Sequence, residues 1–444
     1  MRILPTFVLL LYGLSACAQN TAMTPKASTT KSTLTKSTSK TPVTVKASDA
    51  LTVHRAAIVI DAHADTTQRF LDENWSLGDP LKGGSLNFES AKKGNLGAEF
   101  FSIWVNPEAF KGQYAHRTLA LIDAVYRQAA KYPDQMRMAY SAADIVAAHG
   151  QHKLAAVMGI EGGHSIENDL GLLRDYYRLG VRYMTLTWSN STDWADSSGD
   201  YTDDKIPHTK EGLSEFGKDV VYEMNRLGMM VDVSHVADKT FYRTLVISRA
   251  PVIASHSSAR ALCDAPRNMT DEMLHAVAVN DGVVMVNFYS AFLSQEFRNA
   301  QQAQAPERDT AIESLKAKYA TEARPVDYNA VNDLHKQFTV KIPRPPFTIL
   351  IDHIDHIAKV AGVDHVGLGS DFDGVDSLPE GLDTAADLPK ITEALMARGF
   401  SAADCDKILG GNLLRVFRKV EAVSHQLQSE GRPRIRQHQP GEKP

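Results

Sequence analysis

Eight short apolar runs recur along this chain, and most are separated by stretches with helical periodicity. The runs cover residues 56–60, 98–104, 155–160, 181–187, 229–234, 251–255, 282–288 and 365–370. The helical stretches include residues 115–131, 170–179, 212–227, 238–248 and 346–361. Strand–helix alternation repeated eight times predicts an α/β fold whose parallel sheet closes as a (β/α)8 TIM-type barrel, with a doubly wound open sheet as the alternative.

One connection in this pattern is unusually long. Residues 289–345 are too many and too charged for a simple link between two elements. We therefore predict an insertion before the last strand. The barrel with this insertion accounts for residues 49–424, and such barrels run from about 200 to more than 400 residues.

The two ends of the chain have compositions that cannot support a packed core. Residues 1–17 contain a short apolar stretch and end in Leu14-Ser15-Ala16-Cys17, which looks like a bacterial lipobox. We expect a lipoprotein signal peptide, lipidation at Cys17 and a lipid-anchored, periplasm-facing protein, with the outer membrane as its location because Ala18 follows. Residues 18–48, rich in Ser, Thr and Lys, predict a disordered tether, and residues 425–444 predict a disordered tail.

Charge and cysteine content narrow the function classes. A formal net charge of −5 and a pI near 6.3 do not indicate nucleic-acid binding. Cys263 and Cys405 could pair in an oxidising compartment, but their presence does not establish a bridge.

Metal-binding residue types follow several of the apolar runs. His63 and Asp65 follow the first run, Glu161 the third, His235 the fifth, His256 the sixth and Asp371 the eighth. The carboxyl ends of all strands face one rim of a barrel, so we expect these side chains to meet there. Three imidazoles with carboxylates are enough for a two-metal hydrolytic site.

Seven short segments, in a fixed order over residues 50–420, carry a family resemblance. They are Ile60-Asp-Ala-His-Ala-Asp65, Gly159-Ile-Glu-Gly-Gly-His-Ser165, Val181-Arg-Tyr-Met-Thr-Leu-Thr187, Val231-Asp-Val-Ser-His235, Pro251-Val-Ile-Ala-Ser-His-Ser-Ser-Ala259, Arg267-Asn-Met269 and Gly369-Ser-Asp-Phe-Asp-Gly374. With these segments the chain resembles the renal, or membrane, dipeptidase family of zinc metallopeptidases, a branch of the amidohydrolase-type barrels.

The resemblance implies two zinc ions per chain and hydrolysis of dipeptides, including those with a C-terminal D-residue. His63, Asp65 and Glu161 would hold one ion, and Glu161 would bridge to a second ion held by His235 and His256. Neutral imidazoles and carboxylates suit zinc. A hydroxide shared by the two ions would attack the peptide carbonyl.

Three further residues receive roles from the same resemblance. Asp371 matches the acidic residue that takes the proton from the water and passes it to the leaving amine. Arg267 matches the residue that grips the free carboxylate of the substrate, a task suited to the fork of a guanidinium. Trp188 stands where the better-studied dipeptidases have a histidine thought to hydrogen-bond the oxyanion, and an indole offers one N–H donor and no charge.

Other candidate residues are predicted to be structural. His353 and His356 lie on a predicted helix that enters from the opposite rim of the barrel, and His164, Asp232 and Asp373 are interpreted as supporting residues.

Two alternative functions remain open. One is a related binuclear metallohydrolase acting on a lactone or an N-acyl amino acid, and the other is a non-catalytic peptide-binding lipoprotein, for which Trp188 is the cue. The expected partners are a dipeptide substrate, the membrane through the lipid anchor, and a second copy of the chain, because the family is often dimeric. No nucleic-acid partner is expected.

Overall fold

A computed structural model describes residues 47–199, 212–322 and 328–431 of the 444-residue chain. The predicted signal peptide with Cys17, the tether up to residue 46 and residues 432–444 lie outside these ranges. No helix within them is long and apolar enough to cross a membrane.

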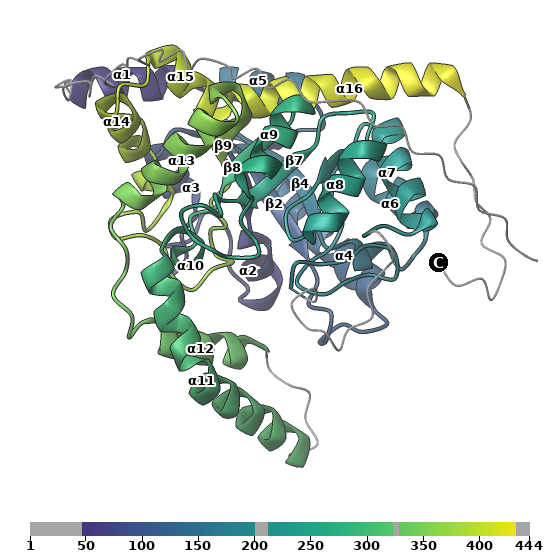
Figure 1. Ribbon diagram of the computed structural model, residues 1–444, viewed down its shortest axis with the longest axis vertical. Coiled ribbons are helices and arrows are strands. Elements are labelled where there is room, and N and C mark those ends of the chain that lie inside the picture. The colour runs from purple at the N-terminus through teal and green to yellow at the C-terminus, as the bar shows by residue number, and fades with distance from the viewer. Residues whose placement is uncertain (1–46, 200–211, 323–327, 432–444) are drawn as a thin grey trace, which may run out of the picture. The chain divides into compact units, whose positions relative to one another are not determined.

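Eight parallel strands form a ring in the order β1-β2-β4-β5-β6-β7-β8-β9 (Figure 1). Their bounds are β1 Val59–Ala64, β2 Leu96–Trp104, β4 Leu154–Glu161, β5 Val181–Thr185, β6 Met230–Asp232, β7 Ile253–Ser257, β8 Val283–Val286 and β9 Val366–Leu368. The first and last strands meet just beyond β9, where Asp371 N donates to His63 O at 2.9 Å and Asp65 N donates to Phe372 O at 2.8 Å. The ring is therefore a nearly closed TIM-type barrel, as the alternation predicts, and the open sheet is excluded.

Helices surround this ring. They are α1 Ala47–Ala56, α2 Thr66–Asp72, α3 Phe88–Lys93, α4 Tyr114–Lys131, α5 Ala142–Gly150, α6 Leu170–Arg178, α7 Glu215–Leu227, α8 Asp238–Ile247, α9 Asp271–Val279, α13 Thr348–Val360, α14 Pro389–Ala397, α15 Ala402–Asp406 and α16 Asn412–Glu430. Side-chain caps fix several starts: Ser214 accepts from Gly217 N before α7, and Thr270 accepts from Met273 N before α9. The helix α7 ends at Gly228, whose φ of 89° is the left-handed conformation that favours glycine.

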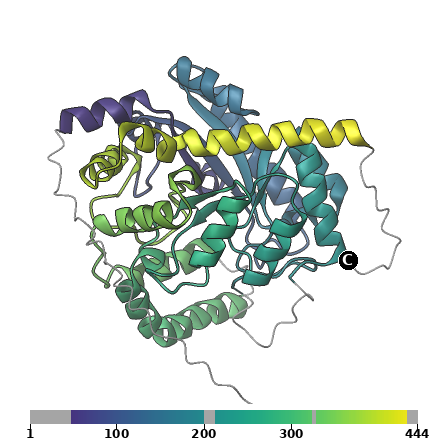
Figure 2. The ribbon, with the colours of Figure 1, turned by 45° about the horizontal axis from the view of Figure 1, so that its top comes forward.

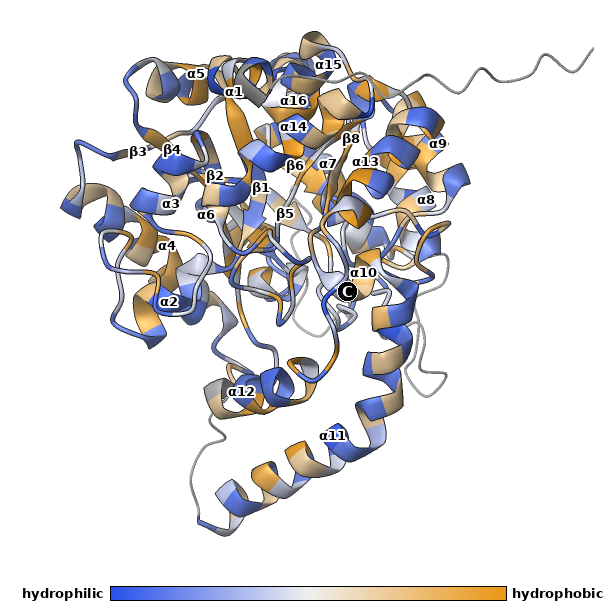
Figure 3. Cartoon of the chain, turned by 90° about the vertical axis from the view of Figure 1, so that its left-hand side faces the viewer, coloured by the Kyte–Doolittle hydropathy of each residue, from blue (hydrophilic) through white to orange (hydrophobic). Residues whose placement is uncertain are grey.

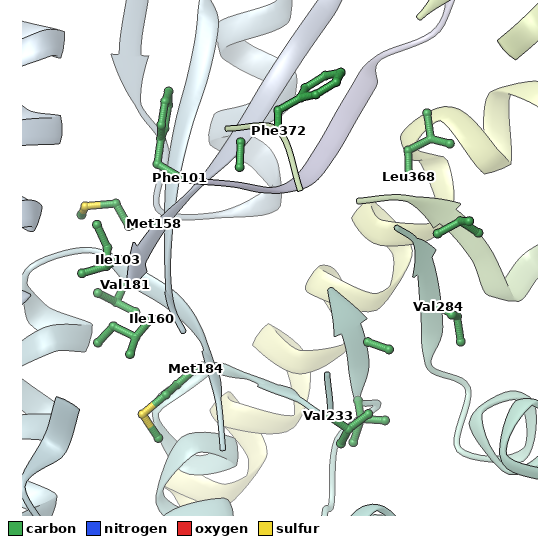
Figure 4. Packing of buried hydrophobic residues seen from close by; sticks show 14 of the residues in the cluster. Phe101, Ile103, Met158, Ile160, Val181, Met184, Val233, Val284, Leu368 and Phe372 are labelled. Atoms are coloured by element: carbon green, nitrogen blue, oxygen red, sulfur yellow. The ribbon is translucent and has the colours of Figure 1, made fainter. Parts of the chain in front are cut away.

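Two apolar layers lie on the two faces of the barrel wall. Side chains on the outer face, such as Phe101, Met158 and Met184, pack among the surrounding helices (Figure 4). Alternate strand residues, such as Phe100, form a second layer inside the barrel together with Phe417 of α16. The helix α16 thereby covers the end of the barrel opposite the carboxyl ends of the strands (Figure 2).

The predicted insertion is helical. Between β8 and α13 the chain forms α10 Ser290–Leu293, α11 Gln295–Thr321 and α12 Tyr328–Thr339. Helices α11 and α12 project at the end of the barrel away from α16, and polar residues line much of their surface (Figures 1 and 3). Lys316 of α11 contacts Glu108 in the β2–α4 connection at 3.4 Å, so the insertion reaches across from β8 to the β2 side of the rim.

Three elements differ from the sequence prediction. The short strand β3, Met136–Met138, pairs with β4 and was not predicted. The helix α1 precedes the first predicted run. The helix α16 continues to Glu430 with Leu427 1% exposed, so the disordered tail predicted from residue 425 begins too early.

Candidate metal centre

The five predicted metal ligands and Asp371 lie at one rim of the barrel. Glu161 is the last residue of β4, and its two carboxylate oxygens face different histidines. Oε2 lies 3.3 Å from Nε2 of His63, and Oε1 lies 2.9 Å from Nε2 of His235. Oε1 also lies 3.7 Å from Nε2 of His256. Glu161 thus stands between one histidine from β1 and two histidines from the β6–β7 side.

Two overlapping groups in this cluster have the spacing of a metal site. In one, ligand atoms of His63, Glu161 and His256 lie within 4.8 Å of one another. In the other, those of His63, Asp65 and Asp371 do so. Neither group is one of the two predicted ligand sets, because His63 belongs to both groups, Asp371 joins one of them and His235 belongs to neither.

Burial gives two of the histidines a protonation state that suits a cation. Burial lowers the pKa of His235 and of His256 well below the usual range, so both imidazoles are neutral and keep a lone pair for a metal. Burial, with Asp65 nearby, raises the pKa of Glu161 to about 7. Nε2 of His63 and Oδ1 of Asp65 are buried and have no hydrogen-bond partner among the described residues. Because unpaired buried polar atoms are costly, a divalent cation bound by these atoms would stabilise them.

Hydrogen bonds behind the cluster orient the ligands. Nδ1 of His256 lies 2.8 Å from Oγ of Ser255, which donates to Oδ2 of Asp232 at 2.6 Å. Nδ1 of His63 lies 2.7 Å from the hydroxyl of Tyr183. Both histidines therefore direct Nε2 into the site, because Nδ1 is already engaged.

The sequence prediction found only part of this support. Asp232 was expected to support the site, whereas Tyr183 and Ser255 were missed, as was Ser102, whose hydroxyl donates to Oε2 of Glu161 at 3.1 Å. The inward-facing alternation of the barrel strands was the one available signal for these positions.

Two site residues occupy a backbone region that non-glycine residues seldom adopt. The φ of His235 is 66° and that of Asp371 is 62°. Such conformations cost of order 1–3 kcal/mol and cluster at functional sites. Both residues follow short strands, so the turn at the strand end directs their side chains across the rim.

Asp371 and Arg267 lie at the same rim. Oδ2 of Asp371 accepts a hydrogen bond from Asn287 at 2.8 Å, and burial raises the pKa of Asp371. Arg267 donates through Nη2 to the backbone oxygen of His256 at 3.1 Å. Burial lowers the pKa of Arg267 to about 10, while Asp371 and Glu161 act in the opposite direction, so the guanidinium stays charged at neutral pH.

Trp188 also lies beside the cluster. Its ring centroid is 6.3 Å from that of His235 and 5.0 Å from that of Trp104. The side chain is half-buried. It is therefore part of the wall of the site.

The family model for the membrane dipeptidases, peptidase family M19, matches residues 47–431 of this chain. The chain belongs to this family. Among curated proteins it is similar to Dipeptidase 3 of Mus musculus, with 35% identity over 340 residues, which cover 77% of this chain and 59% of that protein. Dipeptidase 3 of Homo sapiens is 34% identical over 347 residues, with 78% and 61% covered. The chain thus spans about three fifths of the length of these relatives.

Solved structures of the family share the fold. The probable dipeptidase PvdM from Pseudomonas aeruginosa has a TM-score of 0.71 at 25% identity and covers 85% of this chain and 98% of its own. A metallopeptidase from Rhodobacter sphaeroides, liganded with a phosphinate mimic of the dipeptide L-Ala-D-Ala, has a TM-score of 0.65 at 25% identity, with 82% and 99% covered.

In this member of the membrane dipeptidase family, three further candidate histidines bond residues outside the two ligand groups. His353 hydrogen-bonds the backbone of Leu293 at 2.9 Å, and His356 contacts Asp271 at 2.7 Å. His164 hydrogen-bonds the backbone oxygen of Val105 at 2.8 Å. None of these three histidines belongs to either ligand group.

Asp373 and the two cysteines also lie outside these groups. Asp373 accepts hydrogen bonds from Thr66 at 2.5 Å and from Ser85 N at 2.7 Å. Cys263 and Cys405 are both buried and free. None of the three contributes to the two ligand groups of the rim.

Proposed function

We propose that this protein is a zinc-dependent dipeptidase with two ions per chain, and that it accepts dipeptides with a C-terminal D-residue. The observation that carries the proposal is the position of Glu161, whose two oxygens face His63 on one side and His235 with His256 on the other. The family membership and the ligand of the Rhodobacter sphaeroides relative, a mimic of L-Ala-D-Ala, support the substrate class.

Residues around the cluster would transfer the proton and bind the substrate carboxylate. Two zinc ions, when bound, would lower the pKa of a water molecule and polarise the peptide carbonyl. Asp371 holds a carboxylate at the rim, where it would accept the proton of the water and deliver it to the leaving amine. Arg267 is half-buried and keeps its charge, and it would pair with the free carboxylate of the substrate. Fixing that carboxylate near the cluster would explain a limit of two residues.

The test is turnover by the full-length protein on a panel of dipeptides with L- and D-residues at the C-terminal position. Metal content is counted in the wild type, in Trp188→His and in Glu161→Gln. We expect turnover with two metals per wild-type chain, and loss of both metal and turnover in Glu161→Gln.

Three results would contradict the proposal in different ways. Faster cleavage of N-acylated amino acids or lactones than of dipeptides would favour the related metallohydrolase. Peptide binding without turnover would favour a non-catalytic binding protein. Turnover that appears only in Trp188→His, with unchanged metal content, would mean that the native substrate is not a dipeptide.

We further propose that Cys17 carries the lipid that holds the enzyme at the outer membrane, facing the periplasm. The support is the segment Leu14-Ser15-Ala16-Cys17 and the Ser/Thr/Lys-rich stretch after it. Cell fractionation of wild type and Cys17→Ala, with labelling by a radioactive fatty acid, tests this. Equal labelling of both proteins would contradict it.

A further inference from the structure

Two tryptophans lie together above the ligand cluster. Trp104 is the last residue of β2 and is in register with Glu161, the last residue of β4. Ser102, two residues earlier, contacts Glu161 from the same strand face. Because strand side chains alternate, Trp104 shares that face and lies one step nearer the mouth of the barrel. Trp188 follows β5, and its ring is 5.0 Å from the Trp104 ring at an angle of 54°.

Hydrogen bonds to the backbone carbonyl oxygens hold both tryptophans in place. Gln68 donates to the carbonyl oxygen of Trp104 at 2.8 Å, and Ser197 donates to that of Trp188. Both indoles are half-buried, so each keeps an exposed part. Nε1 of Trp104 is buried and has no hydrogen-bond partner within the described ranges. The indole pair is therefore a fixed, mainly apolar surface beside the ring of His235.

Trp104 lies on the side of the barrel opposite the residue proposed to hold the substrate carboxylate, whereas Trp188 follows β5, two places from β7, and contacts Trp104. In the ring of eight strands, β2 is four places from β7, and Arg267 follows β7 with its guanidinium on the backbone of His256. If Arg267 fixes the C-terminal carboxylate and the peptide carbonyl lies at Glu161, the N-terminal residue points toward the indoles. This step rests on the proposed dipeptidase function.

We propose that Trp104 and Trp188 bind the side chain of the N-terminal residue and select neutral apolar side chains, aromatic ones above all. Aromatic pairs gain energy from offset or tilted packing in addition to buried area. An acidic side chain would lose its hydration against the indoles, and the pair offers no cation to offset that loss. A glycine would leave the surface uncovered.

The experiment compares kcat/KM of the full-length, metal-loaded protein on three dipeptides that share one C-terminal residue. Their N-terminal residues are Phe, Gly and Glu. We expect Phe to exceed Gly by about tenfold or more, a typical range for apolar pocket contacts, with Glu lowest. In Trp104→Ala and in Trp188→Ala the Phe-to-Gly ratio should fall toward one, mainly through KM for the Phe peptide. Trp104→Phe should retain most of the ratio.

Two controls separate specificity from damage to the fold. Tyr242→Ala removes an aromatic side chain that is 43% exposed on α8 and should leave the ratio unchanged. Thermal unfolding and metal content show whether each tryptophan variant is folded and loaded, and Trp104→Phe remains informative if an alanine variant is not.

The inference and the proposed function fail in different ways. Equal kcat/KM on the three peptides, or a ratio that survives in both alanine variants, would overturn the inference and leave the dipeptidase intact. A fourth dipeptide with an N-terminal Lys tests a cationic side chain. Faster cleavage of this peptide than of the Phe peptide would also overturn the inference, because the indoles would then bind a cation. Hydrolysis of none of the peptides would contradict the proposed function, and the inference with it.

Discussion

The role of Asp371 can be tested with a single substitution. It belongs to a ligand group with His63 and Asp65, and it is also the proposed proton carrier. Asn has nearly the same shape and tolerates a positive φ. We expect Asp371→Asn to lower kcat by about 10²–10⁴ while metal content and KM change little, because only proton transfer is lost. Steady-state kinetics with metal analysis measures this.

The matched control is Asp373→Asn, two residues further on. Asp373 has a φ of 65°, close to the 62° of Asp371, and bonds Thr66 and Ser85 instead of the site. We expect Asp373→Asn to reduce the free energy of unfolding and to have little effect on kcat. Loss of one metal in Asp371→Asn would show that Asp371 is a ligand and contradict its role as proton carrier.

Sequence patterns located the candidate ligands but not the residues that orient them. His63, Glu161 and His256 stand out because charged or metal-binding types rarely end an apolar run. Tyr183 and Ser102 are ordinary residues of buried strands, and their function depends on which strand lies next to which. That information is set by the closure of the ring and by register, neither of which a single sequence shows.

A substitution in helix α16 can test where the folded domain ends. Its last turns carry polar residues on the outer face, which makes residues 425–430 look like a tail, yet Leu427 is 1% exposed. We expect Leu427→Ala to reduce the free energy of unfolding by about 2–5 kcal/mol, because the substitution removes a buried side chain. Chemical denaturation measures the change.

The control in the same turn is His425→Ala, at an exposed position of the helix. It should change stability by less than about 0.5 kcal/mol. If Leu427→Ala were equally mild, the tail predicted from residue 425 would be correct after all.

The repeated elements were predictable and the irregular ones were not. All eight barrel strands coincide with apolar runs, because strands buried on both faces are nearly continuous in apolar residues. The strand β3 has three residues, too few to show a pattern, and α1 directly follows the polar tether stretch. The insertion was recognised by its length and charge, but its fold into α11 and α12 was not predicted.

For the whole molecule, metal and stability should be linked. The predicted ligands come from β1 and the residue after it, from β4 and β7, and from the turn after β6, so a bound cation would join segments far apart in sequence. A ligand that binds only the folded state, at 100 times its Kd, adds about 2.7 kcal/mol to stability. We therefore expect a chelator to lower the Tm and added zinc to restore it, measured by thermal unfolding.

The reference for this experiment is Glu161→Gln. Its Tm should depend much less on chelator, because the carboxylate that contacts His63, His235 and His256 is lost. An identical chelator effect in both proteins would place the stabilising metal elsewhere.

The contact between the first and last strands also determines the stage of synthesis at which the candidate site is complete. His63 and Asp371, on either side of that junction, are joined by a backbone hydrogen bond of 2.9 Å. During synthesis of the chain, His63 is made early, whereas Asp371 is made only after the insertion. Until then the barrel wall is incomplete and the candidate site lacks Asp371. Under the proposed function, a chain whose last strand has not yet been made would therefore be inactive toward dipeptides.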